Sequence, residues 1–486
     1  MRARAAITFA GRGCALLCAN LWVMSTRAPA RRSGFDPLDE SKPLWKSLAI
    51  FLVPLMLSNV MQSASGTFGS IFLGRLIGVG ALAAVSAVFP IIFALFSFLI
   101  GIGSGSTVLI GQAYGANDLH KVKKIAGTVL GATLALGIVV AVLGELFSPS
   151  MLAALGTPAS IIHNSDRYAR VLFLFSPVLF PYITYTTVMR GVGDAKTPFY
   201  ALTFSTILSI VLAPAFILGW FGLPHLGVVS VAVASIIAQS LALIGLLLTL
   251  RLRNDPLQLD REMLRDFIVD WKIFWMVLRI GIPTGIQVVL FALAEVAVIT
   301  FVNRFGPSAT AAYGAVNQVA SYVQFPAVSL GIAASIFGAQ CIGARREDRL
   351  RGVVRAAVTL NYIVVGVLVV FCYIFAHDIL GWFITDMPTL KIAAGLLAIT
   401  LWSYVFFGNS SVISGVVRSS GDVIVPMFNG IAAIWLVEVP AAYLLMQRFG
   451  VDGIWMGYAL SFCVVLALQF GYYEFFWKRR THERLV

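Results

Sequence analysis

The chain has 486 residues, of which 59% are hydrophobic and only 12% are charged, and its mean hydropathy is +0.90. Water-soluble globular chains have roughly half apolar and about a quarter charged residues, so this composition excludes an ordinary soluble protein. The net charge of +13 does not indicate nucleic-acid binding, because the basic residues lie in short segments between long apolar stretches.

The first 44 residues precede the apolar stretches and are expected to form an N-terminal cytoplasmic segment (residues 1–44). Arg2, Arg4 and Arg12, followed by an apolar run and small residues, resemble a secretory signal peptide. Cleavage there would leave the mature N-terminus outside, against the charge pattern of every later loop. We therefore expect an over-extended start, with Met24 as a plausible initiator.

Twelve apolar stretches follow, each long enough to cross a bilayer as a helix of about 20 residues. They lie near residues 47–70, 80–110, 124–147, 168–189, 198–220, 226–250, 273–302, 309–339, 352–376, 392–416, 425–446 and 453–476. The sequence therefore predicts an all-α polytopic membrane protein that has the lipid bilayer as a partner.

Basic residues gather in the loops on one side of the predicted membrane, including residues 121–124, 251–272 and 345–355. The loops on the other side hold few, among them Arg75 and Arg304. By the positive-inside rule, the basic side is cytoplasmic. We expect a multi-pass protein of the inner (plasma) membrane with both termini in the cytoplasm.

The apolar pattern occurs twice, at an offset of 228 residues. Residues 188–198 match 416–426, and Gln112 and Gly115 match Gln340 and Gly343. Each half has an even number of spans and enters the membrane in the same direction, so a pseudo-two-fold axis along the membrane normal relates the halves. We predict two six-helix lobes, a cytoplasmic linker between them and a cytoplasmic tail, over residues 45–250, 273–477, 251–272 and 478–486 respectively.

The linker contains an amphipathic pattern. Leu264, Phe267, Ile268 and Trp271 share one helical face, whereas the charged residues lie mostly elsewhere. This pattern is typical of a helix that lies on the cytoplasmic surface of the membrane. A linker helix packed on the lobes would show the same pattern, so both interpretations stay open.

Two carboxylates lie inside predicted spans, where a charge costs at least a few kcal/mol unless it faces water or a partner. Glu295 is near the middle of the seventh span, and Glu438 lies inside the eleventh. Such a carboxylate can bind a proton or a sodium ion and can balance a cationic substrate. Either residue can instead be a buried structural group. Glu295 is the main candidate for ion coupling.

Other polar residues inside the spans are candidates for lining a substrate cavity: Gln287, Asn317, Tyr404 and Asn409 in the C-terminal half, and Asn59 and Gln62 in the first span. Hydrogen bonds between helices are the alternative role for each of them. Pro54 and Pro283 lie near the starts of the first and seventh spans, where proline permits helix bending. Passive packing is an equal alternative for both prolines.

An R-x-x-G-D sequence joins spans 4 and 5 and recurs between spans 10 and 11. Arg190 and Asp194 in the first loop, like Arg418 and Asp422 in the second, can neutralise each other across a tight turn at the glycine. The duplicated position on the cytoplasmic side favours a structural or gating role over contact with substrate.

No enzyme motif is found in the sequence. The glycine-rich stretch Gly101–Ser106 lies inside a span, without the strand–turn–helix context that phosphate binding needs. The five cysteines and five histidines show no spacing typical of a metal site. We expect neither catalysis nor a metal centre, and no cofactor other than a coupling ion, H⁺ or Na⁺.

Over roughly residues 45–475 the chain resembles the multidrug and toxic compound extrusion (MATE) family of transporters. The resemblance rests on the span count, both R-x-x-G-D loops, the stretch Phe68–Ser86 and the loop GQAYGANDLHKVKK. It implies two six-helix lobes in a V shape. It also implies export of organic, usually cationic, compounds against an inward flow of sodium ions or protons.

The sequence departs from this family at acidic positions. Many relatives carry an aspartate in span 1 where this chain has Gly69, and acidic groups on spans 7 and 10 where it has Phe291 and Phe407. Glu295, one helical turn beyond Phe291, is expected to substitute for the acidic group of span 7. No acidic replacement is found on span 10.

The leading hypothesis is a secondary antiporter that exports small organic, cationic or amphipathic molecules by alternating access. One alternative is a lipid-linked oligosaccharide flippase of the same superfamily, although a pyrophosphate headgroup should require cationic cavity residues and the spans show no such cluster. The other is a non-transporting membrane sensor, which would need an effector domain or a long ligand loop. We expect a monomer that binds a small-molecule substrate and no nucleic acid.

Overall fold

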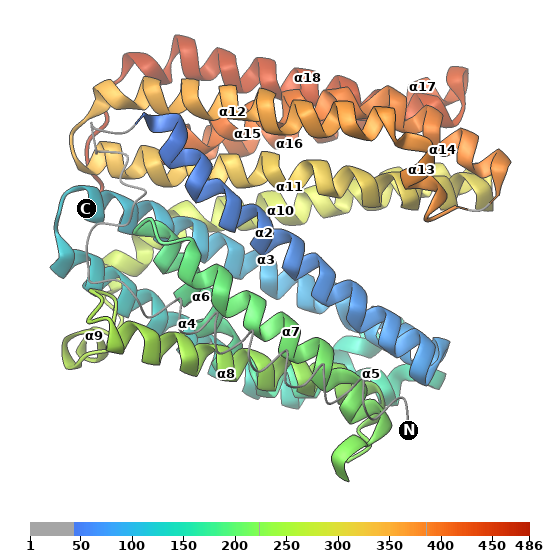
Figure 1. Cartoon of the computed structure of the whole chain (residues 1–486), viewed down its shortest axis with the longest axis horizontal. Coiled ribbons are helices and arrows are strands. Elements are labelled where there is room, and N and C mark those ends of the chain that lie inside the picture. The colour runs from blue at the N-terminus through green and yellow to red at the C-terminus, as the bar shows by residue number, and fades with distance from the viewer. Residues whose placement is uncertain (1–42, 223, 385) are drawn as a thin grey trace.

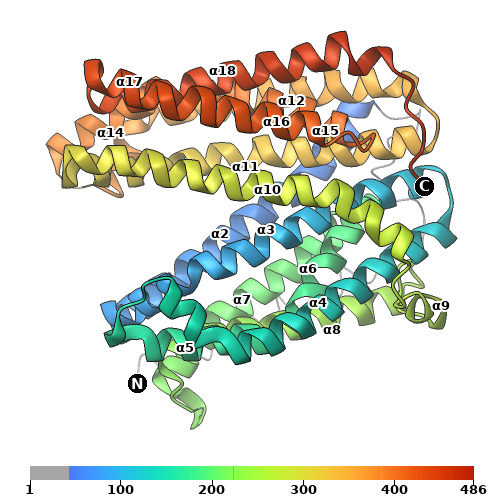
Figure 2. The same cartoon turned by 180° about the vertical axis from the view of Figure 1, so that it is seen from behind.

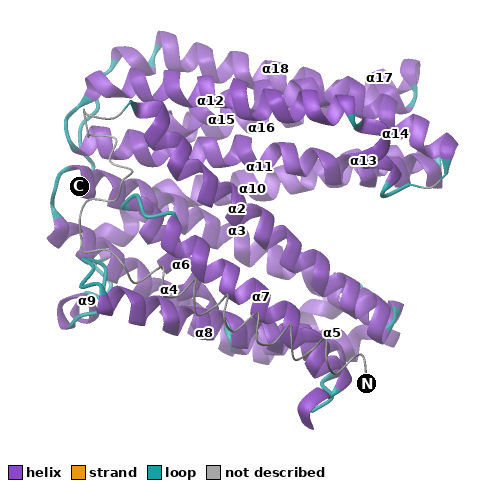
Figure 3. Cartoon of the chain, viewed as in Figure 1, coloured by secondary structure: helices purple, strands orange, loops and turns teal. Residues whose placement is uncertain are grey.

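The computed structural model describes residues 43–222, 224–384 and 386–486, so the predicted N-terminal segment lies almost wholly outside the described residues. The described chain consists of helices and short connections, with no strand (Figure 3). The helices form two bundles that converge at the end where the chain reaches residue 486 and diverge at the opposite end (Figures 1 and 2). The predicted all-α, two-lobed fold is confirmed.

The helices of each bundle follow the chain order. The first half contains α2 (Leu44–Phe72), the π-helical turn η1 (Leu73–Ile77), α3 (Val79–Gly115), α4 (Leu119–Ala154), α5 (Ala159–Leu174), α6 (Ser176–Gly191), α7 (Lys196–Leu218) and α8 (Ser230–Leu252). The second half contains α10 (Trp271–Val302), α11 (Pro307–Gly343), α12 (Glu347–Ile374), α13 (Ala376–Gly381), α14 (Met387–Thr400), α15 (Tyr404–Arg418), α16 (Ile424–Ala432), the π-helical turn η6 (Ala433–Glu438), α17 (Val439–Phe449) and α18 (Val451–Phe475).

The first helix of each half reaches the opposite bundle. Helix α2 packs on α7 of its own half and on α11 and α12 of the other half, and α10 packs extensively on α3. The close approach of α10 and α3 depends on Gly101 and Gly281, because a Cβ at either glycine would crowd the backbone of the other helix. The two bundles are therefore joined by crossing helices as well as by the linker.

Eleven helical segments of the described chain are long and apolar enough to cross a membrane, and α5 with α6 make a twelfth if the pair counts as one span. These two helices meet at an angle of 57°. The expectation of one continuous span near 168–189 is therefore wrong. Pro177 lies in the first turn of α6 and has no N–H to donate back into α5, so the helix breaks between Leu174 and Ser176.

The equivalent point of the second half is irregular, but the span there is continuous from Met387 to Ser419. Phe175 corresponds at the 228-residue offset to Ser403, which ends a 3-10 turn between α14 and α15. Gly78 and Gly306 correspond as well, with φ angles of 117° and 90°, and each directly precedes α3 or α11. A side chain disfavours such φ angles, so glycine is needed at both positions. The internal duplication seen in the sequence extends to backbone conformation.

The linker packs on the first lobe through the one-turn helix α9 (Arg261–Arg265). The Lys123 ammonium on α4 contacts the carboxylates of Asp260 at 2.6 Å and Glu262 at 2.8 Å, and Met263 is fully buried. The hydrogen bond from Lys123 holds the pKa of Glu262 below its ordinary value. These contacts favour the interpretation of a linker helix packed on the lobes.

The apolar face of the linker is nevertheless largely uncovered. Leu264, Ile268 and Trp271 are 52%, 80% and 69% exposed, whereas Phe267 packs against the apolar core of the first lobe. An exposed apolar face beside basic residues also fits a membrane surface. The linker thus combines features of both interpretations.

Candidate functional site

The carboxylate of Glu295, on α10, is held by two tyrosine hydroxyls. Its Oε2 accepts a hydrogen bond from Tyr313 on α11 at 2.7 Å and another from Tyr458 on α18 at 2.8 Å. The two hydroxyl oxygens lie 3.1 Å apart. Three helices of the second lobe therefore converge on one carboxylate oxygen, while Glu295 itself remains exposed.

Aromatic packing fixes the two tyrosines. Trp455 is 1% exposed, and its ring centroid lies 5.3 Å from that of Tyr313 and 5.5 Å from that of Tyr458. Trp455 and Tyr458 are three residues apart on α18, so they share one helical face. Close packing leaves such rings few alternative rotamers. Their hydroxyls are thus positioned toward Glu295 before any ligand binds.

Glu438, the second predicted carboxylate, is 3% exposed and ends the π-helical turn η6. The hydroxyl of Ser461 on α18 donates to the Ala433 carbonyl, where this turn begins, at 3.1 Å. Glu438 is close enough to Glu295 for their charges to interact. Short π-helical segments within α-helices are frequent at functional sites. The two intramembrane carboxylates predicted from the sequence therefore belong to one lobe and one electrostatic environment.

Two further candidates join this group. Asn317 lies one turn after Tyr313 on α11 and interacts with its hydroxyl. Tyr404 is buried at the start of α15, close enough to Glu295 and Glu438 for electrostatic interaction. We use the name carboxylate cluster for these residues: Glu295, Glu438, Tyr313, Tyr458, Asn317 and Tyr404.

Tyr313 and Tyr458 were not among the residues predicted from the sequence. A tyrosine inside an apolar span carries a hydroxyl that needs a hydrogen-bond partner once it is buried. That signal was available at both positions. A helical wheel, however, does not show which helix supplies the partner, so the pairing with Glu295 required the structure.

Gln287 belongs to a different region from Glu295, although both lie on α10. Eight residues separate them, which is about 12 Å along a helix at 1.5 Å per residue. The Gln287 Oε1 accepts a hydrogen bond from the Arg418 guanidinium at 2.6 Å. Gly430 on α16 leaves space for it, because a Cβ there would lie 2.5 Å from the Gln287 Nε2. Gln287 therefore lies outside the cavity that the sequence predicted it to share with Glu295.

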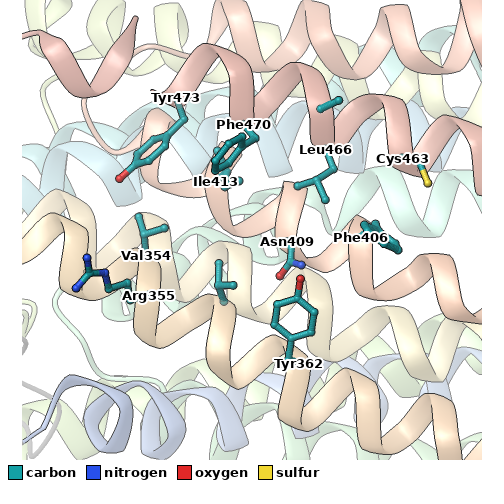
Figure 4. Close-up of a pocket in the computed structure, with 12 residues that line it drawn as sticks. Val354, Arg355, Tyr362, Phe406, Asn409, Ile413, Cys463, Leu466, Phe470 and Tyr473 are labelled. Carbon is teal, nitrogen blue, oxygen red and sulfur yellow. The ribbon is translucent and has the colours of Figure 1, made fainter. Parts of the chain in front are cut away.

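Asn409 is also separate from the carboxylate cluster. It is 4% exposed, and its Oδ1 accepts a hydrogen bond from Asn361 on α12 at 2.9 Å, while the same Asn361 amide donates to the Val405 carbonyl. Asn409 also lines a cavity of about 460 Å³ between α12, α15 and α18 (Figure 4). Its hydrogen bonds match the alternative role of joining helices.

The candidates on the first span face the other lobe or remain exposed. Asn59 on α2 donates to the Ser329 hydroxyl on α11 at 3.0 Å, which bridges the two halves. Gln62, three residues later, is exposed. Pro54 and Pro283 lie inside α2 and α10. Their role in helix bending stays a prediction.

The R-x-x-G-D loops form the predicted tight turns. Gly193 has a φ of 91° and Gly421 a φ of 89°, values that favour glycine. Asp194 begins α7 by accepting hydrogen bonds from the backbone N–H groups of Lys196 and Thr197, each at 3.0 Å. Its carboxylate therefore fixes the helix start.

The charged residues of these loops are not paired as predicted. Arg418 donates to Gln287, and Asp422 accepts a hydrogen bond from the Tyr472 hydroxyl on α18. Arg190 lies half-buried at the end of α6. Within the described residues neither arginine forms an ion pair with the aspartate of its own loop, because each aspartate has other donors closer at hand. The arginine and aspartate of each loop therefore do not form the mutually neutralising pair that was expected from the sequence.

Two glutamines close the convergent end of the molecule. The Gln112 Nε2 on α3 donates to the Ser419 carbonyl of the second lobe at 2.8 Å, and the Gln340 Nε2 on α11 donates to the Gly191 carbonyl of the first lobe at 3.1 Å. Both donors and both acceptors are related by the 228-residue offset. We call these four groups the glutamine seam. It is a pseudo-symmetric pair of hydrogen bonds between the lobes.

Close approach of α3 and α11 makes the seam geometrically possible. A Cβ on Gly115 would overlap the Gln340 carbonyl, and a Cβ on Gly343 would overlap the Gln112 carbonyl. The sequence analysis aligned these glutamines and glycines as repeats but assigned them no role. Their function as a contact between lobes appears only when the two helices are placed side by side.

Comparisons with known proteins agree with this architecture. A protein-family profile described as MatE matches residues 54–215 and 283–444, one match in each half. Among curated proteins, the probable multidrug resistance protein YoeA of Bacillus subtilis (strain 168) is 50% identical over 450 residues, which cover 92% of this chain and 97% of the relative. The probable multidrug resistance protein NorM of Thermotoga maritima is 24% identical over 428 residues, which cover 87% of this chain and 90% of the relative.

Solved structures share the fold at lower identity. An outward-facing conformation of a multidrug resistance MATE family transporter of the MOP superfamily is 20% identical, with a TM-score of 0.82 and coverage of 91% of this chain and 97% of that chain. A mutant of the Vibrio cholerae MATE transporter VcmN is 19% identical, with a TM-score of 0.82 and coverage of 90% and 98%.

Proposed function

Because the chain belongs to the multidrug and toxic compound extrusion (MATE) family, we propose that it is a secondary active antiporter of the plasma membrane. It exports small organic compounds, cationic or amphipathic, against an inward flow of protons or sodium ions. The names of its relatives as multidrug resistance proteins support this substrate class. The observation that carries the coupling proposal is the Glu295 carboxylate, held by the hydroxyls of Tyr313 and Tyr458.

The chemistry of the carboxylate cluster suits exchange of an ion against a cation. An ionised Glu295 is stabilised by two charge-assisted hydrogen bonds. A proton would neutralise it directly, and a sodium ion would find hard oxygen ligands in the carboxylate, the tyrosine hydroxyls and the Asn317 carbonyl. Either ion cancels the charge that attracts a cationic substrate. Ion and substrate therefore compete for Glu295, as antiport requires.

Glu438 strengthens the attraction for one cation. Two ionised carboxylates in a low-dielectric bundle repel each other, and a bound cation relieves that repulsion. Glu438 is buried, whereas Glu295 is exposed. We therefore assign direct exchange to Glu295 and an electrostatic supporting role to Glu438.

The glutamine seam supplies the conformational part of the mechanism. It joins the lobes at the end where the basic loop 345–355 and residues 478–480 lie, which we take as the cytoplasmic side. On this assignment the described conformation is closed to the cytoplasm, with the start of α2 and residue 486 on that side. Transport requires the seam to open, and a ligand drives this only if it binds the two states with different affinity. Both lobes come from one chain, so a monomer is sufficient.

Gradient-driven uptake into everted membrane vesicles, which corresponds to efflux from the cell, tests the coupling. We expect Glu295→Gln to abolish this transport of a panel of cationic dyes driven by an imposed gradient, with proton and sodium gradients varied independently. The matched control is Glu145→Gln, which removes a carboxylate that pairs with Arg170 at a surface helix position. Unchanged gradient-driven efflux in Glu295→Gln would show that the assigned coupling role is wrong.

A further inference from the structure

The cavity between α12, α15 and α18 is separate from the carboxylate cluster, none of whose acidic residues line it. Its volume of about 460 Å³ lies within the range of cavities that hold small ligands. Helix α15 forms its floor, since the opposite side of α15 packs on α11. Exposed residues of α12 and α18, Tyr362 and Phe470, lie at its edge (Figure 4). The cavity therefore opens toward the surrounding lipid rather than toward the other lobe.

The chemistry of the cavity changes along its length. Most of the lining is apolar, from Val358, Ile413 and Leu466. At the end nearest the cytoplasmic loops, Arg355 on α12 lines it beside Tyr473 on α18 (Figure 4). The apolar slot suits the acyl chain of an anionic lipid, and the cation at its cytoplasmic end suits the headgroup.

The charges of the arginines at this end of the cavity are not neutralised by the described residues. Arg351 lies one helical turn before Arg355, both are exposed, and both act electrostatically on Tyr473. Among the described residues neither arginine has an ion pair or hydrogen-bond partner. By contrast, Asp348 on the same helix is already paired with Arg346. Basic pockets between membrane helices on the cytoplasmic side bind anionic headgroups, and guanidinium groups bind phosphate in a bidentate manner.

We propose that this cavity is a binding site for one anionic phospholipid of the cytoplasmic leaflet. An acyl chain fills the slot above α15, and the headgroup phosphate pairs with Arg355 and Arg351. Because α15 ends at Arg418, which binds Gln287, the lipid would rest on the same helix that carries the second R-x-x-G-D loop. The site lies outside the proposed transport route and does not depend on it.

Native mass spectrometry of the purified full-length protein tests this site. We expect one phosphatidylglycerol to be retained per protein, in preference to phosphatidylcholine, and Arg355→Gln with Arg351→Gln to lower its retention at least tenfold. Arg265→Gln, an exposed cation on the linker, is the charge control. Val358→Trp should fill the slot and displace the lipid, whereas Val367→Trp, 63% exposed on the same helix, should not. Equal retention of both lipids, or retention unaffected by the arginine variants, would overturn the proposal.

A different feature, the segment after α18, carries a second inference. The His482 ring stacks on Trp477 with 4.0 Å between centroids, and its backbone N–H donates to the Glu347 carboxylate at 2.9 Å. The backbone N–H of Leu485 then donates to the Gln112 Oε1 at 2.8 Å. This segment thus contacts the same glutamine whose Nε2 forms the seam.

The side chains of this segment fill the junction between the lobes. The Leu485 side chain covers Gly421 so closely that a Cβ there would lie 2.6 Å from the Leu485 Cδ1. Val486 packs against an apolar core that combines residues of the first lobe, such as Val122, with Val423 of the second. The side chain of Gln340, the symmetry mate of Gln112, forms its one hydrogen bond within the described residues with the Gly191 carbonyl. The segment therefore hydrogen-bonds to one glutamine of the seam and not to its symmetry mate, so the closure of the lobes is not fully symmetric.

We infer that residues 481–486 act as a latch that stabilises the seam-closed conformation and must leave Gln112 before the lobes separate. This inference rests on the proposed alternating access. Removal of a latch should shift the population toward the conformation open to the cytoplasm, because only the closed conformation gains its contacts.

Distances between spin labels on the two lobes test the latch. Labels at Lys196→Cys and Arg345→Cys, in a chain without its native cysteines, report the cytoplasmic separation. We expect removal of residues 481–486, or Leu485→Asp, to raise the population with long distances several-fold, whereas Arg484→Gln should leave it unchanged. An unaltered distance distribution after removal would overturn the latch. Because no ion gradient is used, this result is independent of whether Glu295 couples transport.

Discussion

At the scale of single residues, the hydrogen bonds on Glu295 bear on the proposed ion coupling. Tyr313 and Tyr458 donate to the same carboxylate oxygen. Donors to a carboxylate stabilise its ionised form, so removing one should act in opposite directions on the two coupling ions. A proton should bind more tightly, and a sodium ion, which loses an oxygen ligand, should bind more weakly.

Tyr458→Phe tests this reasoning and separates the two ions. A hydrogen bond to a charged group contributes about 1.5–3 kcal/mol, which corresponds to roughly tenfold or more in affinity. If protons couple transport, half-maximal efflux should shift by about one pH unit toward higher pH. If sodium does, the half-saturating sodium concentration should rise about tenfold. Tyr443→Phe, whose ring is exposed and packs on Phe301, is the control. If neither shift is observed, Tyr458 does not belong to the ion-coupling site.

At the scale of elements, breaks in the helices place the functional groups. The π-helical turn η6 carries Glu438, and irregular turns at Phe175 and Ser403 lie at equivalent positions of the fourth and tenth spans. Each extra residue in a π turn rotates the following helix relative to the preceding one. Glu438 thus owes its orientation to η6 as much as to its place in the sequence.

Deletion of Leu436 tests the role of this turn. Leu436 is 74% exposed, so its loss removes little packing. Restoring the α-helical register should turn the segment before Glu438 by about 100° relative to the carboxylate, which disrupts the electrostatic link to Glu295. We expect gradient-driven efflux to fall at least tenfold while the protein still folds, as judged by its melting temperature. Leu436→Ala should keep efflux; equal efflux in the deletion variant would contradict a role for η6.

The segment after α18 should respond to pH. Burial lowers the pKa of His482 below its ordinary value of 6.5 and acts with the charge of Arg480, outweighing the opposing effects of Glu347, of a hydrogen bond to the Trp477 backbone and of Asp422. The docked segment therefore favours the neutral ring. Docking should be fully stable above about pH 6.5 and weaken as the pH falls below that value. Cross-linking of Gln112→Cys to Leu485→Cys should drop over this range, and His482→Gln should abolish the pH dependence. A cross-linking yield that does not depend on pH while His482 is present would contradict this pH dependence.

Much of this element-level picture could be predicted from the sequence, because hydropathy and the 228-residue repeat can be recognised without knowing how the helices pack. The spans, the two lobes, the turns at Gly193 and Gly421 and the two carboxylates follow from them. The partners could not be predicted. Arg418 binds Gln287 instead of Asp422, and Tyr458 reaches Glu295, because side-chain pairing depends on how distant helices pack. A hydropathy window also averages over the break at Phe175.

At the scale of the whole molecule, the two halves share a closure but not the proposed ion site. The glutamine seam is duplicated, since Gln112 and Gln340 bind equivalent carbonyls. Glu295 and Glu438 have no acidic counterparts at the same offset in the first half. In the proposed mechanism, an ion bound in one lobe would control a closure formed by both.

The symmetry of the closure makes a paired prediction. Gly115→Ala and Gly343→Ala should each prevent the close approach of α3 and α11, and by similar amounts, because the two positions are equivalent. We expect both to increase the population open to the cytoplasm in spin-label distance measurements. Gly366→Ala, on α12 with nothing near its Cβ, should not. Strongly unequal effects of the two substitutions would contradict a symmetric seam.

Simultaneous recording of substrate efflux and ion influx in liposomes that contain the purified protein tests the coupling through Glu295 without an indirect readout. We expect a fixed ratio of ions to substrate for the unsubstituted protein. In Glu295→Gln we expect the substrate-dependent ion influx to be lost. Ion influx that remains coupled to substrate efflux in Glu295→Gln would contradict the assignment of coupling to the carboxylate cluster of the second lobe.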